Sequence, residues 1–417
     1  MREWGAHFTC IAPDTPGFGQ SDPLPTPSPE IEDFADALVQ FTDAVGIRSI
    51  LGYGFHSGGI ILVTAMKRHM ARFTGLAIGG YAIWNEDERV NIGPPYIPPN
   101  PPKAYGEHLV WLWNRILEQS WYFPWFDPSD ANRMSVAHAD LIRVDTVIQD
   151  MLNSGDAYRL GYGAVLRVGR DIPPAGAVTP PVRITAYKGD PLEQHLARLH
   201  DLPNGWEAYA VDTPSAHQDE SLAFLLKHVP TGSDVLSEDS NRGFLHIATE
   251  HFDGLIHWQG PRDASRLMVH APGREAALFG HSQAICIDLP GHGLSQGWPG
   301  QAPEIWAPWQ AVIDKVAAHF GAKEIVHEPL PAGDPVRLYP DLSPDRFGHY
   351  LTKAWAIVRA QHIFAPWYEA SAANAIPIDA ARLVPASLAI EHRALVRAYA
   401  ARALHIARLN KENIDGN

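Results

Sequence analysis

The sequence predicts an α/β protein built on a doubly wound, mostly parallel sheet. Short apolar runs alternate with amphipathic stretches such as IEDFADALVQFTDAVG, and this alternation is typical of parallel strands connected by helices. The expected strands are, in chain order, HFTCIAPD, RSILGYG, FTGLAIGG, VRITAYKGD and EAYAVDT. Ligands of such sheets bind beyond the carboxyl ends of the strands. His56, Asp190 and His217 all follow a predicted strand closely and are therefore candidate site residues.

The chain contains two copies of the same sequence pattern. An apolar strand leads into Asp and then Pro-Gly-x-Gly-x-Ser near residue 14 and again near residue 288. Further along, YGEHLVWLWNRILEQSWYFPWF resembles FGHYLTKAWAIVRAQHIFAPWY, which places Trp113 opposite Trp355. Matches that recur in the same order indicate an internal duplication. We therefore predict two related halves.

The two halves are incomplete in different ways. The first, residues 1–230, lacks an opening hairpin and the strand that follows it. A polar linker is expected at 231–243. The second, residues 244–417, opens with a hairpin whose tight turn we place at Asp253-Gly254, but it lacks a counterpart of FHSGGIILVTAMKRHMARFTGLAIGGYAIW.

Composition excludes several classes of function. The net charge of −14 argues against binding to nucleic acid or to an anionic membrane surface. No apolar run approaches the roughly 20 residues that span a bilayer, and the first residues lack the pattern of a secretory signal. The two cysteines, Cys10 and Cys286, lie in apolar runs and are expected to be free thiols. We therefore expect a cytoplasmic protein.

No cofactor or metal is implied by the motifs. The glycines of GYGFHSGG match neither a dinucleotide nor a P-loop fingerprint. His246, His251 and His257 cluster in the predicted hairpin, but their spacing is not that of metal ligands.

The segment GYGFHSGG, residues 52–59, is the strongest chemical signal. A G-x-S-x-G turn between a strand and a helix presents its central side chain on a sharp elbow. Here Gly54 and Gly58 bracket His56, so the histidine takes the central position. We expect both glycines to permit close backbone approach, and Gly59 to let the helix pack on the sheet. Ser57 follows the elbow, so its backbone N–H and that of Gly58 are candidates for binding an oxyanion.

Three interpretations of His56 remain open. Neutral imidazole can act as a nucleophile and form an acyl-imidazole. An imidazole can also serve as a general base toward water or a substrate proton. Alternatively, the histidine is a packed remnant in a protein that only binds a ligand or partner.

The residues above resemble the α/β-hydrolase superfamily, in the branch of epoxide hydrolases and haloalkane dehalogenases that carries a helical cap. The resemblance is carried by DTPGFGQSD, the elbow GFHSGG, ITAYKGD and a histidine before the last helix; LMVHAPG and DLPGHGLSQG extend it to the second half. It implies a capped α/β-hydrolase fold plus a second, degenerate copy. It further implies hydrolysis of an ester, lactone or epoxide, with lyase chemistry as another option.

The resemblance also implies site roles. Asp190 holds the place of the family's acid and His217 that of its base, which gives a His-Asp-His site with His56. Glu86 or Asp87 is a fallback acid. Such a group titrates as a unit and suits water activation or proton abstraction better than acyl transfer.

The caps are expected at about 91–165 and 340–417, and the first begins with the extended, proline-rich NIGPPYIPPNPP. Aromatic side chains at high density favour an apolar pocket and a small apolar substrate. The four candidates for lining it are Trp111, Trp113, Trp121 and Trp125.

One strand is missing from the first half. In the resembled fold, the strand that matches RLMVHAP lies between those that match HFTCIAPD and RSILGYG. An unfilled gap leaves ladder hydrogen bonds unmade. The second half, a second chain in a homodimer, or a longer tandem protein could fill it; we favour two copies that jointly build one or two sheets. The oxyanion turn of the family matches only HAPG, residues 270–273.

Overall fold

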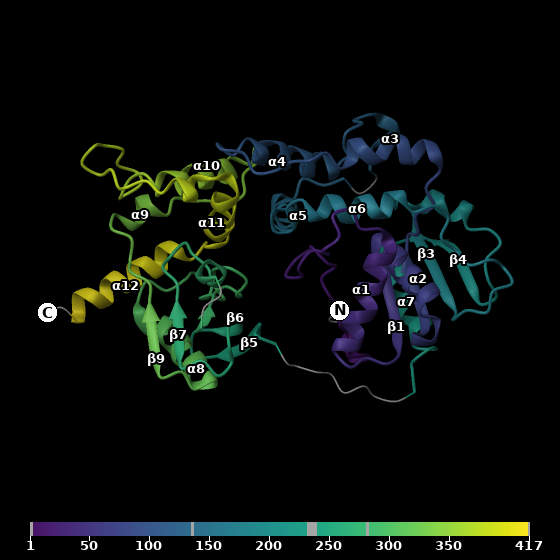
Figure 1. Cartoon of the computed structure of the whole chain (residues 1–417), viewed down its shortest axis with the longest axis horizontal. Coiled ribbons are helices and arrows are strands. Elements are labelled where there is room, and N and C mark those ends of the chain that lie inside the picture. Colours follow the sequence, from purple (N-terminus) through teal and green to yellow (C-terminus); the bar gives the residue numbers. More distant parts are fainter. Residues whose placement is uncertain (1–2, 135–136, 232–239, 281–282, 416–417) are drawn as a thin grey trace. The chain divides into compact units, whose positions relative to one another are not determined.

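The computed structural model describes residues 3–134, 137–231, 240–280 and 283–415, and the chain divides into two compact units (Figure 1). The first comprises residues 1–101 and 115–238, and the second comprises 102–114 and 239–417. The prediction differs in one segment, because it assigned 102–114 to the first half. Most of the predicted linker lies outside the described residues, at 232–239.

The first unit has a four-stranded, fully parallel sheet in the order β1-β2-β3-β4. Its strands are β1 Ile50–Phe55, β2 Phe73–Gly79, β3 Val182–Tyr187 and β4 Trp206–Val211. The helix α1 Ile31–Ala44 precedes β1, α2 Ser57–Arg68 connects β1 to β2, and α7 Pro214–Leu225 follows β4. The predicted α/β class is confirmed, and four of the five expected strands form.

Local sequence accounts for these elements. Glu30 and Asp33 form a reciprocal capping box at the start of α1, and Pro214 occupies the first turn of α7 after the cap residue Thr213. β2 is buried along almost its whole length, as expected for a central parallel strand covered on both faces. The core between α1, α2 and the sheet contains Ile60 and Ile78, which are fully buried.

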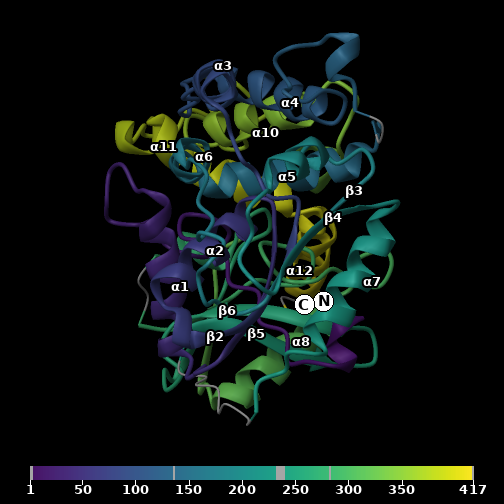
Figure 2. The ribbon, with the colours of Figure 1, turned by 90° about the vertical axis from the view of Figure 1, so that its right-hand side faces the viewer.

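The segment predicted to be the first cap consists of helices between β2 and β3. They are α3 Glu86–Tyr96, the second half of α4 Glu107–Gln119, α5 Leu141–Ser154 and α6 Ala157–Arg167. Figures 1 and 2 show α5 and α6 above the sheet. The proline-rich lead-in departs from the prediction, because α3 continues through Pro94 and Pro95 and ends at Tyr96. The capping box of Asn85 and Glu88 fixes the start of this helix.

The second unit has a five-stranded mixed sheet in the order β5-β6-β8-β7-β9. Its strands are β5 Arg242–Ala248, β6 Asp253–Gln259, β7 Arg266–Val269, β8 Ile285–Ile287 and β9 Glu324–His327. The hairpin β5–β6 is antiparallel, but its turn is Thr249–Phe252 and not Asp253-Gly254, which belong to β6. The hydroxyl of Thr249 accepts hydrogen bonds from the N–H groups of His251 and Phe252 and so stabilises the turn.

Helices surround this second sheet and extend into its cap. They are α8 Trp306–Phe320, α9 Pro335–Leu338, α10 His349–Ala360, α11 Pro385–Arg397 and α12 Ala401–Asp415. Short 3₁₀ segments occur in both units, at Trp4–Ala6, Met70–Arg72, Asp130–Asn132, Glu193–Arg198, Ala276–Phe279 and Ala380–Leu383. No helix of the described residues is both long and apolar enough to cross a membrane.

The expected strand HFTCIAPD does not form. Residues 8–13 carry no strand, and Ile11 is 41% exposed. The equivalent residues of the second unit form β8, where Ile285, Cys286 and Ile287 are completely buried between neighbouring strands. A strand needs a partner, and among the described residues β1 pairs only with β2. The gap expected from the sequence is therefore present in the first unit.

Several contacts recur between the segments whose sequences are similar. Gln20 donates its backbone N–H to Asp14 at 2.9 Å, and Leu294 donates to Asp288 at 2.9 Å. In the cap segments, the isolated bridge between Tyr122 and Arg133 recurs 242 positions later as Phe364 with Ala375. The two loops and the two cap segments thus repeat at the spacings read from the sequence.

Candidate active site

The turn between β1 and α2 has the geometry of an elbow. His56 has φ 48° and ψ −112°, a backbone conformation that residues other than glycine rarely adopt. Its backbone N–H donates to Gly79 of the neighbouring strand at 2.7 Å, and its carbonyl accepts from Gly59 at 2.9 Å. Backbone strain of this kind costs about 1–3 kcal/mol and persists only where the surroundings enforce it. The fold therefore holds His56 in one orientation.

The glycines of the elbow differ in what they permit. A Cβ on Gly54 would lie 2.6 Å from the backbone of Gly58, and one on Gly59 would lie 2.5 Å from Ile78 of β2. Both positions therefore require glycine, as predicted. Gly58 corrects the prediction, because a Cβ there would meet nothing within 4 Å.

His56 is hydrogen-bonded to Asp190, which lies in the turn after β3. The Nε2 atom of His56 is 3.0 Å from Oδ1 and 3.1 Å from Oδ2 of Asp190. The Asp190 side chain is fully buried, whereas that of His56 is 32% exposed. Oδ1 of Asp190 also accepts the backbone N–H of Leu192 at 2.7 Å, which fixes the carboxylate. A buried carboxylate that accepts from one imidazole nitrogen orients the ring and stabilises its charged form.

A glycine that the sequence analysis did not single out makes room for this pair. Gly80 has φ +54°, and a Cβ on it would lie 2.7 Å from the imidazole of His56 and 3.2 Å from Oδ1 of Asp190. The Gly-Gly pair at the end of FTGLAIGG is the signal that could have identified it.

His217 is near this pair but bonded elsewhere. Its Nε2 atom is 2.9 Å from the hydroxyl of Tyr53, and its Nδ1 atom is 2.6 Å from the hydroxyl of Thr185. The ring of Phe55 packs against both imidazoles, with centroids 4.1 Å from His56 and 5.7 Å from His217. The expected contact of Asp190 with His217 is therefore replaced by one with His56.

Burial determines the protonation of His217. The residue is 1% exposed, and burial lowers the pKa of its imidazole, although the nearby carboxylate of Asp190 acts in the opposite direction. With both ring nitrogens hydrogen-bonded to hydroxyl groups, His217 has no nitrogen free for a substrate. Its geometry is that of a neutral structural histidine.

The fallback acids do not approach either imidazole. Glu86 is exposed and pairs with Arg89, and Asp87 is exposed at the start of α3. They lie in the first turn of a helix, where negative charge is favourable.

Two backbone donors are free at the start of α2. The N–H groups of Ser57 and Gly58 have no hydrogen-bond partner within the part of the chain that the structure describes. The N-terminal end of a helix carries partial positive charge and binds anions. These donors adjoin His56, so the predicted oxyanion position is available for an anionic oxygen. The turn HAPG belongs to the second unit, where Nε2 of His270 accepts the N–H of Leu289 at 3.0 Å.

A cavity of about 220 Å³ opens onto the elbow. His56 and Ser57 form its polar end. The rest of its wall is mostly apolar or aromatic and comprises Ile60, Ala82, Trp84, Ile92, Tyr96, Phe123, Met134, Tyr162, Val165, Leu166, Pro191 and Leu192, together with Gln119. A concave apolar site with a few polar groups is typical of small-molecule binding. An adjacent cavity of about 140 Å³ also reaches Ser57 and Gly58, between Phe18, Phe34 and Gly161.

The predicted tryptophans do not line this cavity. Trp121 donates its indole N–H to His138 at 2.9 Å, and Trp125 donates to Tyr96 at 3.2 Å, so both stabilise the cap. Trp111 and Trp113 belong to the second unit. The cavity does have an aromatic lining, as predicted. The local sequence pattern, however, does not distinguish the aromatic side chains that face the cavity from those that face away. Trp84, Tyr96, Phe123 and Tyr162 take that place.

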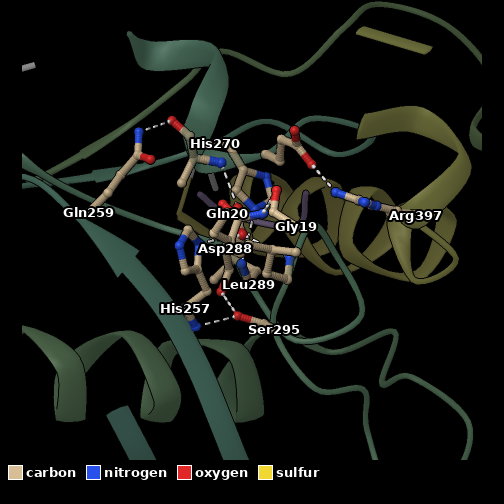
Figure 3. A network of polar contacts seen from close by, with 12 residues as sticks. Gly19, Gln20, His257, Gln259, His270, Asp288, Leu289, Ser295 and Arg397 are labelled. Carbon is tan, nitrogen blue, oxygen red and sulfur yellow. Dashed lines mark hydrogen bonds and ion pairs between the residues drawn. The ribbon is translucent and has the colours of Figure 1, made fainter. Parts of the chain in front are cut away.

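The second unit contains a buried polar network without an elbow (Figure 3). Nδ1 of His257 is 2.8 Å from Oδ2 of Asp288, and both side chains are buried. Burial alone would raise the pKa of Asp288, but the hydrogen bond and charge of His257 lower it below its usual value. After β9 the chain continues as Glu328-Pro329, so no strand-to-helix turn presents a side chain there. This pair stabilises the loop that begins at Asp288.

No group of three or more potential ligands in the described residues is arranged to hold a metal ion. His246 pairs with Asp253 at 2.7 Å and His257 pairs with Asp288, so these two hairpin histidines bind carboxylates.

Comparison with known proteins assigns the fold. Residues 3–118 match the family model described as alpha/beta hydrolase fold. No curated protein sequence matches the chain. Similar solved structures include a thermophilic esterase from Thermogutta terrifontis, with 14% identity, 54% of this chain and 80% of that chain covered, and a TM-score of 0.36.

Two further structures have a similar degree of likeness. An N-acyl homoserine lactonase is 15% identical over 53% of this chain and 79% of that chain, with a TM-score of 0.35. An epoxide hydrolase from metagenomes of hot environments is 15% identical over 55% of this chain and 85% of that chain, with a TM-score of 0.33. With its parallel sheet, its strand-to-helix elbow and the matched family model, the first unit has the α/β-hydrolase fold.

Proposed function

We propose that the first unit is a hydrolase for a small, largely apolar ester, lactone or epoxide. The observation that carries this proposal is the pair of His56 and Asp190 at the polar end of an apolar cavity. A carboxylate that is fully buried and bonded to a partly exposed imidazole is the arrangement that general-base catalysis requires. The cavity of about 220 Å³ limits the substrate to a small molecule.

The hydrogen bonds assign the tautomer of His56. A carboxylate only accepts hydrogen bonds, so Nε2 of His56 carries the proton that is donated to Asp190. In the neutral ring the Nδ1 atom is then an unprotonated base. Within the described chain, the imidazole of His56 has no hydrogen-bond partner other than Asp190. Because Nδ1 is bonded to Cγ, the ring atom that carries Cβ, it is more hindered as a nucleophile than as a base, which favours activation of water over an acyl-imidazole.

The reaction follows for a carbonyl substrate. Nδ1 of His56 takes a proton from water as the water oxygen forms a bond to the carbonyl carbon, and Asp190 stabilises the imidazolium. The N–H groups of Ser57 and Gly58 donate to the oxyanion. When the carbon–oxygen bond to the leaving group breaks, the imidazolium returns the proton to the leaving alkoxide. For an epoxide, Nδ1 of His56 takes a proton from water as the water oxygen attacks a ring carbon, the carbon–oxygen bond of the ring breaks, and the imidazolium protonates the resulting alkoxide.

His217 has a different role in this proposal from the one expected. Through Tyr53 and Thr185 it connects β1, β3 and α7 and so supports the strand that leads to the elbow. The working group is therefore His56 and Asp190, and not two imidazoles that share one carboxylate.

We also propose that the two units descend from one duplicated domain of the capped branch, that the second copy has lost its elbow, and that the protein is cytoplasmic. The repeated loop contacts of Asp14 and Asp288 and the repeated bridge in the caps support the duplication.

Turnover of a panel of short esters, lactones and epoxides tests the function. We expect His56→Gln to lower kcat/KM by about 10²–10⁴ in the substrate that the parent hydrolyses, because general-base catalysis contributes about that factor. The matched control is His200→Gln, which changes a histidine whose side chain is 68% exposed. Equal activity of parent and His56→Gln would overturn the proposal. A parent that turns over no substrate but binds apolar esters would indicate the alternative, a catalytically silent binding protein.

A further inference from the structure

The outer edge of β1 presents unpaired backbone groups. In a parallel ladder, alternate residues direct both N–H and C=O to the same side. His56 donates to Gly79 of β2, so the residues that face away from β2 are Leu51, Tyr53 and Phe55. Among the described residues β1 pairs with no other strand, so this side of the ladder has no strand partner.

The second unit shows what covers the same edge in the other copy. Its strand β9 corresponds to the start of β1 and pairs in parallel with β7. Glu328, the counterpart of Tyr53, donates its backbone N–H to Val269 of β7 at 2.9 Å. The outward-facing amides of Leu51 and Tyr53 therefore have counterparts, Val326 and Glu328, that face β7 in the second unit.

The segment on the other side of the gap also lacks a strand partner. In the second unit, β8 lies on the far side of β7, and Ile285 and Ile287 are fully buried. In the first unit the corresponding residues form no strand, and Ile11, the counterpart of Ile285, is 41% exposed. The first unit thus lacks one strand between two segments that would flank it.

The edge carries none of the features that protect an exposed strand. Natural edges are commonly blocked by charged residues, proline or a bulge that twists the strand away. The sequence of β1, ILGYGF, contains neither charge nor proline, and its register with β2 is irregular only between Ile50 and Leu51, at its start. An unprotected edge of this kind is suited to pairing.

We propose that the outer edge of β1 binds an extended apolar segment of a partner polypeptide as an added parallel strand. Addition of a strand to a sheet edge is an established mode of peptide recognition. The partner strand resembles β7 in its apolar Leu267–Val269. In the second unit, Arg266 and Arg274 on either side of β7 pair with Glu324 and Glu328. The counterparts of these glutamates in the first unit are Ser49 and Tyr53, so the partner strand does not need flanking arginines.

The added strand would end beside the elbow. β1 leads directly from Phe55 into His56, and a parallel partner runs in the same direction. The residues that follow the partner strand would therefore lie next to the free N–H groups of Ser57 and Gly58. This inference does not depend on the proposed reaction, since it concerns backbone pairing alone.

Hydrogen exchange of the full chain, resolved to single amides, tests the proposal. The probe is a peptide of residues 265–273, SRLMVHAPG, and the control peptide carries Leu267→Pro, which removes an N–H that faces β9 in the second unit. We expect the amides of Leu51, Tyr53 and Phe55 to exchange at least about tenfold more slowly with the probe and unchanged with the control.

A covalent version makes a negative result decisive. Residues 240–282 replace residues 1–8, which places a copy of β7 at its native spacing before the segment 9–14 and raises its effective concentration to about the millimolar range. Protection of the three amides in this graft, absent from the same graft with Leu267→Pro, supports the proposal. No protection in either the peptide or the graft experiment overturns it.

Two other results would also overturn it. If the three amides of the chain alone are protected and lose protection on dilution, a second copy of the chain occupies the edge. If they are protected at every concentration, the chain covers its own edge.

Discussion

Trp113 and Trp355, which lie 242 positions apart, form the same hydrogen bond in opposite directions. Trp113 donates its indole N–H to the carbonyl of Arg346 at 3.2 Å, and Trp355 donates to Ala104 at 3.2 Å. The two acceptors are themselves 242 positions apart. Within the second unit, the first half of α4 therefore packs on α10 with the symmetry of an isologous dimer interface, in which each patch contacts its own counterpart.

The first prediction is that Trp113 and Trp355 contribute equally to the stability of the second unit. Trp113→Phe and Trp355→Phe each remove one indole donor, so the carbonyl of Arg346 or of Ala104 loses that hydrogen bond. We expect each change to lower the free energy of unfolding of the second unit by about 1–3 kcal/mol, because a hydrogen bond is lost and a small void remains where a 1% exposed indole was packed. Urea denaturation with tryptophan fluorescence and circular dichroism measures the loss.

Phe347→Leu is the matched control for this pair. Phe347 lies in the same segment as Trp355 but is 69% exposed, so its replacement should change stability by less than about 0.5 kcal/mol. A loss confined to one of the two tryptophans would contradict the equivalence of the contacts.

The second prediction concerns the two glycines that bracket His56. Gly54→Ala places a Cβ 2.6 Å from the backbone of Gly58 and should destabilise the first unit by about 2 kcal/mol or more. Gly58→Ala meets no atom within 4 Å and lies in the first turn of α2, so it should be neutral or stabilise by up to about 1 kcal/mol. Thermal unfolding of both variants checks the difference, and equal losses would show that the elbow is packed differently.

The third prediction is a tautomer. Asp190 accepts from Nε2 of His56, so neutral His56 should carry its proton on Nε2. Long-range ¹H–¹⁵N correlation spectra of the histidine rings distinguish the two tautomers.

A related variant tests the charge of the carboxylate. In Asp190→Asn the amide still offers an oxygen but no charge, and we expect kcat to fall while the fold is retained. A proton on Nδ1 in the parent would contradict the proposed base.

The fourth prediction is a loss of stability in mild acid. Burial lowers the pKa of His392 to about 4, although its hydrogen bond to Leu351 acts in the opposite direction. Its contribution to stability is complete above the pKa of about 6.5 in the unfolded chain and decreases as pH falls. One such histidine costs about 2 kcal/mol at pH 5, because the unfolded state binds the extra proton.

Urea midpoints at pH 7 and pH 5 measure this loss. His392→Gln keeps a donor for Leu351 but cannot be protonated, so its midpoint should change less with pH than that of the parent. His319→Gln, at an exposed position of α8, should retain the full dependence of the parent. Identical pH dependence in all three proteins would exclude His392 as a source.

Much of the fold could be predicted from the sequence because its signals are local. Apolar runs bounded by glycine predict β1 to β4, and the spacing of Gly54, His56 and Gly58 predicts the elbow. Asp190 was found because it follows a predicted strand at the edge where ligands bind.

The remaining features depend on which segments meet. HFTCIAPD has the pattern of a strand, but a strand forms only where a partner is available. The contact of Asp190 with His56 instead of His217 depends on hydroxyl partners, Tyr53 and Thr185, that no spacing reveals. A tryptophan has an apolar ring and a polar N–H, so it suits either a cavity wall or a hydrogen bond within the cap. The sequence therefore does not distinguish the two placements.

The reciprocal contacts of Trp113 and Trp355 have an evolutionary consequence. In a homodimer, one mutation changes both sides of the symmetry axis at once, so self-complementary patches cannot diverge separately. When both patches belong to one chain, each can change alone. His108 contacts Trp355, whereas its counterpart Tyr350 contacts Trp113, so the two sides of this symmetric pair are chemically different. A single gene that encodes both partners can thus specialise one copy while the other preserves the contact surface.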